Sequence, residues 1–342
     1  MASGWVRARA PATIANVGPG FDVFAMAVRG PSDEVAIRFA DRDSLRVHGV
    51  EATRIPSTFS DNTAGIVIDA LRAMTGITQA LEVRVDKGIP PERGLGSSAG
   101  SCVAAALAFL KAFPKSRDLE VAEVLQAAVE GEAAVSGRHY DNVAAALLGG
   151  FITLASTEPL LLARESVSAR IVLAIAIPDF PLRTAEMREI LPDRISLRDA
   201  VSNVGRAATL ALALARGDAV LAGRCLEDRF AEPARARFLT GYANARSAAL
   251  KGGAAGFGIC GSGSSVFAIA PDPTVAEVVA HAMGAAFRSR GHGATPLVTT
   301  VDNRVPLAGI LPGFERHFSV VSGKDRAYDS PRAGPRTPTI EA

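Results

Sequence analysis

Alternation of apolar and polar residues predicts that the chain begins with β structure. Residues 28–39 and 44–50 alternate as half-buried strands do, and the polar cluster 41–43 separates them as a turn. Residues 81–85 form a shorter segment of the same kind. Before it, residues 62–74 place apolar side chains three and four apart, which predicts an amphipathic helix that ends at Gly76.

A glycine- and serine-rich segment, residues 94–100, leads directly into a strongly apolar one. Residues 101–113 are almost entirely Ala, Val, Leu and Phe, so the helix that they predict has no polar face and should be buried. Residues 118–135 predict a further helix, with Asp118 as its N-cap. The glycine-rich loop therefore leads directly into the N-terminus of a buried helix.

The second half of the chain has a different order of elements. Its pattern predicts a buried strand, three consecutive helices, two strands around a glycine and serine turn, a helix and a closing strand. These segments are residues 168–178; 196–216, 218–230 and 233–250; 254–260 and 265–270 around 261–263; 274–289; and 294–301. The whole predicts an α+β chain whose two parts meet near residues 156–166. Residues 324–342 carry three prolines and no apolar period, which predicts a disordered tail.

Composition narrows the class of protein and of ligand. A length of 342 residues is typical of two domains, and 48% apolar against 21% charged residues exclude a predominantly disordered chain. The 37 basic and 35 acidic side chains give a formal charge of +2, without the basic surplus of most nucleic-acid-binding proteins. We therefore expect a small neutral or anionic ligand and no nucleic acid.

Cysteine and histidine positions do not indicate a structural metal or a disulfide framework. The three cysteines lack C-x-x-C spacing and the five histidines lack an H-E-x-x-H pair, so we predict no metal held by protein ligands alone. The first ten residues contain no apolar core of a signal peptide, and no stretch reaches the roughly 18 apolar residues of a membrane span. These features predict a cytoplasmic protein that does not bind a membrane.

Residues 90–100 have the features that a polyphosphate needs. Their glycines let backbone N–H groups approach an anion, and the N-terminus of the following helix favours negative charge. The G-x-x-x-x-G-K-[ST] pattern fails because no lysine follows the second glycine, so a catalytic cation must come from elsewhere. The alternative is a tight strand-to-helix turn that binds nothing.

Three segments resemble the motifs of the GHMP small-molecule kinases. Residues 90–100, PPERGLGSSAG, are similar to the phosphate loop of that family, residues 10–22 to its first motif, and residues 258–263 to its third. Residues 139–144, 148–150, 184–192 and 231–235 further resemble the homoserine kinase branch. Two positions depart from that branch: Glu92, where glycine is frequent, and Ser264, where proline is frequent. The resemblance covers about residues 7–310.

This resemblance implies a fold and an activity. The fold is α+β in two domains, an N-terminal one of the ribosomal-protein S5 domain 2-like type (residues 1–160) and a C-terminal ferredoxin-like one (residues 161–315). The activity is transfer of the γ-phosphoryl group of ATP to the side-chain hydroxyl of L-homoserine, with Mg²⁺, in threonine biosynthesis, and the family leads us to expect a homodimer. The alternatives are a kinase of another alcohol, such as shikimate or mevalonate, and a catalytically silent protein of this fold that senses a ligand.

The resemblance also assigns residues to ATP and to Mg²⁺. Ser98 and Glu130 match the family's metal-binding serine and glutamate. From the residues alone, however, Ser98 is equally well a helix cap, and Glu130 lies opposite the apolar face of its helix, as a solvated side chain would. The residues assigned to ATP are Pro90, Pro91, Glu92, Arg93, Gly94, Leu95, Gly96, Ser97, Ser98, Ala99, Gly100, Gly261, Ser262 and Gly263.

Further residues are assigned to the amino-acid substrate. They are Asn16, Asp22, His139, Asn142, Arg188 and Arg235. Arginine binds a carboxylate through two parallel hydrogen bonds, whereas Asn16 and Asp22 suit an ammonium and a hydroxyl group. The alternatives are a plain turn at residues 16–20, a structural histidine and two surface arginines.

Asp141 is the third candidate catalytic residue, beside Ser98 and Glu130. Its position resembles the aspartate that acts as general base in mevalonate-type members, because a carboxylate next to the substrate hydroxyl can accept its proton. An N-cap for the segment 143–148 is an equally simple role.

Overall fold

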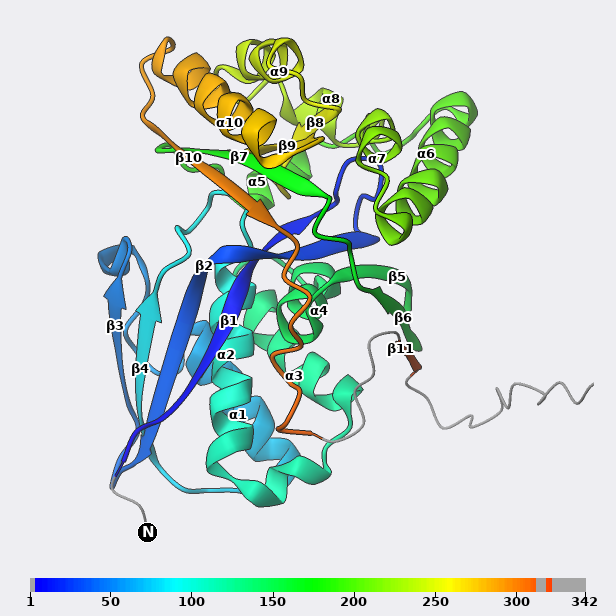
Figure 1. Ribbon diagram of the computed structural model, residues 1–342. Coiled ribbons are helices and arrows are strands. Elements are labelled where there is room, and N and C mark those ends of the chain that lie inside the picture. Colours follow the sequence, from blue (N-terminus) through cyan, green and yellow to red (C-terminus); the bar gives the residue numbers. More distant parts are fainter. Residues whose placement is uncertain (1–3, 312–317, 322–342) are drawn as a thin grey trace, which may run out of the picture.

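The computed structural model describes residues 4–311 and 318–321, which form two sheets with helices packed on them (Figure 1). The tail expected at residues 324–342 lies outside the described residues. Among the described residues, the first sheet has seven strands in the order β11-β6-β5-β2-β4-β3, with β1 paired to β2. Only β3 and β4 run parallel among its pairs. The strands are β1 (Val6–Ala15), β2 (Phe24–Phe39), β3 (Ser44–Gly49), β4 (Leu81–Lys87), β5 (Phe151–Thr157), β6 (Leu160–Glu165) and β11 (Phe318–Val321).

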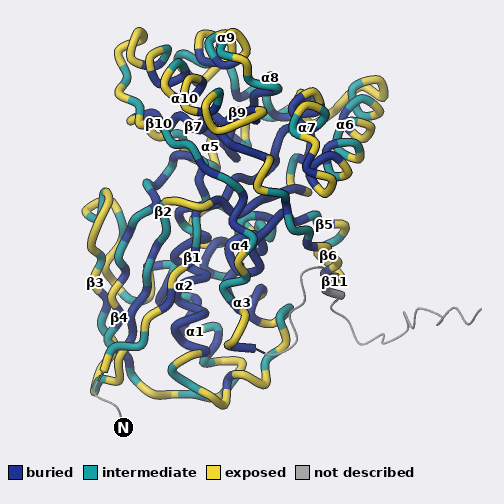
Figure 2. Tube along the Cα trace, in the orientation of Figure 1, coloured by how far each residue is buried: buried dark blue, intermediate teal, exposed yellow. Residues whose placement is uncertain are grey.

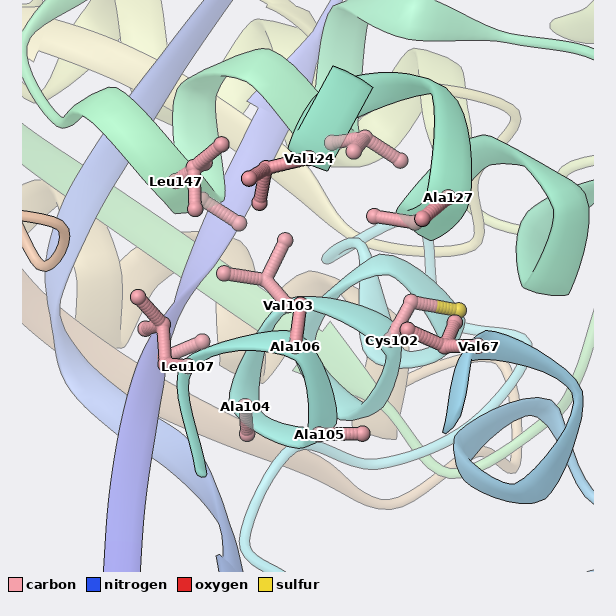
Figure 3. Close-up of a cluster of buried hydrophobic side chains, with 14 of the residues drawn as sticks. Val67, Cys102, Val103, Ala104, Ala105, Ala106, Leu107, Val124, Ala127 and Leu147 are labelled. Carbon is pink, nitrogen blue, oxygen red and sulfur yellow. The ribbon is translucent and has the colours of Figure 1, made fainter. Parts of the chain in front are cut away.

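Helix α2 is the centre of the first core. It packs on β1 and β2 and against three other helices, and its residues 102–110 are buried. Figure 3 shows Val103 of α2 facing Val124 and Leu147, with Cys102 beside Val67. Small side chains let these helices approach closely, which holds the N-terminus of α2 in a fixed place. The helices are α1 (Thr63–Thr75), α2 (Ser97–Ala112), α3 (Val121–Ala133) and α4 (Tyr140–Leu148), with 3₁₀ turns η1 (Ala52–Arg54) and η2 (Pro114–Asp118).

The second sheet is antiparallel, in the order β10-β7-β9-β8, and its strands β7, β8 and β9 are buried beneath more exposed helices, whereas β10 is partly exposed (Figure 2). Its strands are β7 (Val172–Pro178), β8 (Gly256–Ile259), β9 (Val266–Ala270) and β10 (Ala294–Thr300), and its helices are α5 (Thr184–Glu189), α6 (Leu197–Arg216), α7 (Ala219–Arg224), α8 (Glu232–Arg235), α9 (Tyr242–Lys251) and α10 (Pro273–Arg288). One face packs against α9 and α10. The other belongs to a core that includes α6, α7 and also Phe24 and Met26 of β2, so apolar packing joins the two halves.

The predicted strands and most predicted helices are confirmed, and the differences arise at helix ends. Helix α2 begins at Ser97, four residues earlier than predicted, because Gly96 adopts a left-handed conformation at the N-cap. Asp118 is not the N-cap of α3, since Glu120 caps it through a reciprocal capping box with Glu123. The helix predicted at residues 233–250 is interrupted, because Gly241 has a φ of 89° and α9 starts only after it.

Strand β6 belongs to the first sheet and β7 to the second, so we propose a domain boundary in this part of the chain, where the sequence pattern changes.

Strand β1 was not among the predicted strands. Within the described ranges, no helix combines the length and the apolar composition required to cross a membrane.

Candidate functional site

A cavity of about 470 Å³ collects residues from both halves of the chain. Most of the predicted site residues line it. They are Asn16, Asp22, Pro91, Glu92, Gly94, Gly96, Ser97, Ser98, His139, Asp141, Asn142, Arg188, Arg235, Gly261 and Ser262. Pro90, Arg93, Leu95, Ala99, Gly100, Glu130 and Gly263 are predicted site residues that do not line it.

Several of the predicted residues that do not line the cavity are buried beneath the phosphate loop and support it. Leu95 and Ala99 are buried in the two cores. Arg93 is also buried, and its guanidinium donates hydrogen bonds to the carbonyls of Pro91, Pro178 and Asp179. These side chains therefore fix the position of the loop and do not contact the cavity.

The loop itself presents the N-terminus of α2 to the cavity. Gly96 is the N-cap residue, and it has no side chain that could accept a hydrogen bond. The first backbone N–H groups of this 16-residue helix are therefore not capped by it. The Ser97 hydroxyl donates to the carbonyl of Ile89 at 2.8 Å, whereas Ser98 lines the cavity. A helix N-terminus in this state is suited to bind an anion.

Gly96→Ala is expected to destabilise the protein by about 2 kcal/mol or more and to weaken nucleotide binding. Gly96 has a φ of 65°, and a Cβ atom there would lie 1.9 Å from Oγ1 of Thr13. Gly76→Ala is the matched control, because Gly76 has a φ of 70° but open space around it. Thermal unfolding of both variants measures the difference, and equal losses would show that the close approach at Gly96 is unimportant.

Lys87, which sequence analysis did not select, is a buried cation behind the loop. Its ammonium group is paired with Asp33 and donates to the Ser97 carbonyl and the Ser101 hydroxyl, each at 2.8 Å. Lys87 also lines the cavity. Lys87 is the last residue of β4, a strand in which apolar and polar residues alternate. Nothing in that pattern distinguishes Lys87 as a residue of the site.

Glu92 does not leave an unpaired negative charge beside the loop. Its carboxylate is paired with Arg54, and the guanidinium of Arg183 lies 3.7 Å away. The departure from the family pattern at this position is therefore compensated by two arginines, which come from η1 and from the segment before α5.

The metal glutamate predicted from sequence, Glu130, is not brought into the cavity. Both of its carboxylate oxygens accept hydrogen bonds from Arg138, at 2.8 Å each, and its side chain is 32% exposed. Successive helical residues are rotated by about 100°, so Glu132 projects from the opposite side of α3. Glu132 is buried and lines the cavity.

Glu132 has one carboxylate oxygen without a hydrogen-bond partner among the described residues. Oε1 accepts from the Ser136 hydroxyl, whereas Oε2 is buried and unpaired. Burial raises the pKa of Glu132, and the neighbouring hydroxyls of Ser136 and Ser98 offset part of the rise. An unpaired buried carboxylate oxygen next to a serine hydroxyl can supply two of the oxygen ligands that a hard cation needs.

The opposite side of the cavity carries polar groups from distant parts of the chain. The amide of Asn16 donates to the Gly261 carbonyl at 3.0 Å and accepts from the backbone N–H of Asp22 at 3.1 Å. Both oxygens of Asp22 accept from Nη2 of Arg188, at 2.7 and 2.8 Å. This ion pair joins the first motif to α5 across the cavity.

His139 and Arg235 complete this polar wall. Nδ1 of His139 lies 3.3 Å from Nη2 of Arg188, and burial followed by the Arg188 charge lowers the pKa of His139, so its ring is neutral near pH 7. Arg235 is buried and donates to the Gly261 carbonyl at 2.9 Å, and burial lowers its pKa to about 10. The guanidinium carbons of Arg188 and Arg235 both lie 5.4 Å from the centroid of the Phe21 ring.

Asp141 and Asn142 lie between the loop and the polar wall. Asp141 is buried, and Oδ1 accepts from the N–H of Asn142 at 2.7 Å. Burial raises the pKa of Asp141 to about 6. The residue at the N-cap of α4 is His139, so Asp141 does not act as the N-cap that sequence analysis left open. Oδ1 of Asn142 accepts from the Thr13 hydroxyl at 2.6 Å, which orients that amide.

Beyond the loop, the cavity continues toward η1 and the start of α1. This end is lined by Arg54, Ile55, Pro56, Asp61 and Thr63, none of which sequence analysis selected. Their types are common in surface loops, and only the fold brings them to the phosphate loop.

Known proteins resemble this chain over most of its length. The family model for the GHMP kinases N terminal domain matches residues 62–150, and that for the GHMP kinases C terminal matches residues 210–289. A homoserine kinase from Halorubrum lacusprofundi is 41% identical over 268 residues, which is 78% of this chain and 87% of that protein. A homoserine kinase from Halobacterium salinarum is 38% identical over 312 residues, covering 88% and 99% of the two chains.

Solved structures are similar over the same extent. The crystal structure of a homoserine kinase from Cytophaga hutchinsonii superimposes with a TM-score of 0.82 at 36% identity, covering 88% of this chain and 96% of that one. A galactokinase from Lactococcus lactis, at 15% identity and a TM-score of 0.60, covers 87% and 93% and shares the fold. The predicted GHMP kinase fold is thus confirmed, and this chain belongs to the homoserine kinase family of the GHMP kinases.

Proposed function

We propose that this protein transfers the γ-phosphoryl group of ATP to the side-chain hydroxyl of L-homoserine, forming O-phospho-L-homoserine in threonine biosynthesis. The observation that carries the proposal is one cavity that joins an anion-binding helix N-terminus to a wall of arginine, aspartate and asparagine side chains. Phosphoryl transfer depends mainly on positioning and on compensation of charge, and this cavity has groups for both.

The nucleotide phosphates would bind at Gly94, Gly96 and Ser98, where backbone N–H groups and the dipole of α2 favour an anion. The ammonium group of Lys87, whose charge is paired with Asp33, lies behind the loop and donates to the Ser97 carbonyl. The rest of the nucleotide would extend toward Ile55, Pro56 and Thr63, at the other end of the same cavity. This orientation leaves the γ-phosphoryl group facing the polar wall.

Ser98 and Glu132 would hold Mg²⁺, which compensates phosphate charge when it is bound. The unpaired Oε2 of Glu132 supports this assignment in place of Glu130. Within residues 4–311 and 318–321, no three His, Cys, Asp or Glu side chains gather as a metal-binding set. Phosphate oxygens and water would therefore supply the remaining ligands, as is usual for Mg²⁺.

The amino-acid substrate would bind against the polar wall. Arg188 and Arg235 are the groups for its carboxylate, since a guanidinium pairs with a carboxylate through two hydrogen bonds. Asn16, Asp22, His139 and Asn142 offer acceptors and donors for the ammonium group and the hydroxyl. We further propose that the protein works as a homodimer in the cytoplasm.

We further propose that Asp141 accepts the proton of the substrate hydroxyl. Because its pKa is raised to about 6, the group is ionised at pH 7 and loses its negative charge as the pH falls through 6. We expect kcat/KM for homoserine to fall about tenfold per pH unit below pH 6, and Asp141→Asn to lower kcat by about 100-fold and remove this dependence. A wild-type profile that stays flat to pH 5, with unchanged circular dichroism, would exclude Asp141 as the proton acceptor.

The substrate is tested by incubating purified protein with ATP, Mg²⁺ and homoserine, shikimate or mevalonate, and following products by ³¹P NMR. We expect O-phospho-L-homoserine alone. Turnover of another alcohol without turnover of homoserine would replace the proposed substrate. Calorimetric binding of ATP and homoserine without any turnover would instead indicate the silent, ligand-sensing alternative.

A further inference from the structure

Basic side chains that line the cavity differ in how firmly the folded chain holds them. Within the described residues they are Arg54, Lys87, Arg183, Arg188 and Arg235. Lys87 is held in a buried pair with Asp33, and Arg188 donates to both oxygens of Asp22. Arg235 is buried and donates to the Gly261 carbonyl at 2.9 Å. The positions of these three charges are therefore fixed by close contacts.

Arg54 and Arg183 lie on either side of Glu92 and are held very differently. Arg54 forms close ion pairs with both Glu51 and Glu92. Arg183 has only long contacts, since its Nε lies 3.7 Å from Oε1 of Glu92 and its Nη1 lies 3.5 Å from Oε1 of Glu186. An N–H···O hydrogen bond usually spans about 2.7–3.2 Å. With a side chain that is 70% exposed, Arg183 is the most loosely held basic residue of the cavity within the described part of the chain.

The backbone on both sides of Arg183 is nevertheless fixed. The N–H of Leu182 donates to the carbonyl of Glu92, in the phosphate loop, at 3.0 Å. On the other side, the hydroxyls of Thr184 and Ser262 lie 3.1 Å apart. Arg183 therefore combines a fixed backbone with a side chain that can change its partner.

This position lies where the proposed nucleotide and substrate sites meet. Residues 261–263 pack on the phosphate loop, because a Cβ atom on Gly94 would lie 2.0 Å from the carbonyl oxygen of Cys260. Helix α5 begins directly after Arg183 and carries Arg188 of the polar wall. The guanidinium of Arg183 thus extends from the junction between the phosphate loop and the polar wall.

The proposed reaction needs a positive charge at this junction. The oxygen of the homoserine hydroxyl forms a bond to the γ-phosphorus, the bond from that phosphorus to the β,γ-bridging oxygen breaks with its electron pair left on ADP, and the hydroxyl proton passes to Asp141. Negative charge stays on the other phosphoryl oxygens throughout, and a guanidinium compensates such charge well. The phosphate loop has no lysine after its second glycine, and the charge of Lys87 is paired with Asp33.

We propose that Arg183 is a further catalytic residue, whose guanidinium contacts the γ-phosphoryl group of ATP during the transfer. Its long contact with Glu92 is exchanged for a charge-assisted hydrogen bond to a phosphoryl oxygen, while the contacts of Leu182 and Thr184 keep the backbone in place. This inference rests on the proposed function and adds to it a residue that sequence analysis did not select.

The binding of two nucleotides tests the contact without any turnover. In calorimetry with Mg²⁺, we expect Arg183→Gln to weaken binding of adenylyl imidodiphosphate, which has a γ-phosphoryl group, about tenfold and to leave ADP binding within about twofold. Arg194→Gln controls for the loss of one positive charge, because Arg194 is exposed beyond α5 and does not line the cavity. It should leave the binding of both nucleotides unchanged.

Steady-state kinetics give a second measurement. Arg183→Gln is expected to lower kcat about 30-fold while KM for homoserine changes less than about threefold. Arg183→Lys should recover part of kcat, because the ammonium group keeps the charge but not the planar shape of the guanidinium. The unfolding temperature should not change, since the side chain is exposed and its ion pairs are long.

Two results would overturn the proposal. Equal weakening of both nucleotides in Arg183→Gln would show that Arg183 only positions the phosphate loop. Unchanged binding of the imidodiphosphate together with an unchanged kcat would show that Arg183 is a surface charge. The nucleotide comparison uses no homoserine, so a wild type that fails to phosphorylate homoserine would refute the proposed substrate and leave the test of Arg183 intact.

Discussion

Glu132→Gln is expected to lower kcat about 100-fold or more and to raise the Mg²⁺ concentration required for half-maximal activity. The amide keeps the shape of the side chain but loses the negative charge that a divalent cation needs. The fold should not be weakened, because burial raises the pKa of Glu132, which means that the charged carboxylate is unfavourable in the folded protein. We therefore expect an unfolding temperature equal to or above that of the wild type at pH 7.

Glu130→Gln is the matched control on the same helix. Glu130 is half-buried, forms an ion pair with Arg138 and does not line the cavity, so its replacement should leave kcat within about threefold of the wild type. Steady-state kinetics at several Mg²⁺ concentrations decide between the two carboxylates. A large loss in Glu130→Gln with near-normal turnover in Glu132→Gln would restore the assignment made from sequence.

Arg235→Leu is expected to raise KM for homoserine about 100-fold while KM for ATP changes less than about threefold. Arg235 is buried at the polar wall, and a guanidinium so placed is the strongest available partner for a carboxylate. The variant should fold, because the Gly261 carbonyl that accepts from Arg235 also accepts from the amide of Asn16.

Arg237→Leu controls for the loss of one positive charge, since Arg237 is exposed two residues further on and does not line the cavity. It should leave both KM values unchanged. Equal increases in KM for homoserine and ATP in Arg235→Leu would argue against a carboxylate contact. Recovery by Arg235→Lys, even partial, would support the charge as the cause.

The two glutamates of α3, Glu130 and Glu132, show which part of the site could not be predicted from the sequence. Resemblance to the family pointed to this helix, but the choice between Glu130 and Glu132 depended on about half a turn of helix. A signal for Glu132 was present: Leu125, Val129 and Glu132 are spaced four and three apart, so a carboxylate shares the apolar face of α3. A charged residue at a buried position must be paired or functional, and here it forms the wall of the cavity.

What the sequence determined by itself is local. The glycine loop that begins α2, the amphipathic and buried helices, and the alternating strands follow from backbone preferences and from the period of apolar residues, which act over a few positions. The tertiary structure alone decided which side chains meet. Asp22 and Arg188 are 166 residues apart and Thr13 and Asn142 are 129 apart, yet each pair forms a hydrogen bond at the cavity. Such contacts depend on how two sheets and their helices pack together, and no local pattern specifies that packing.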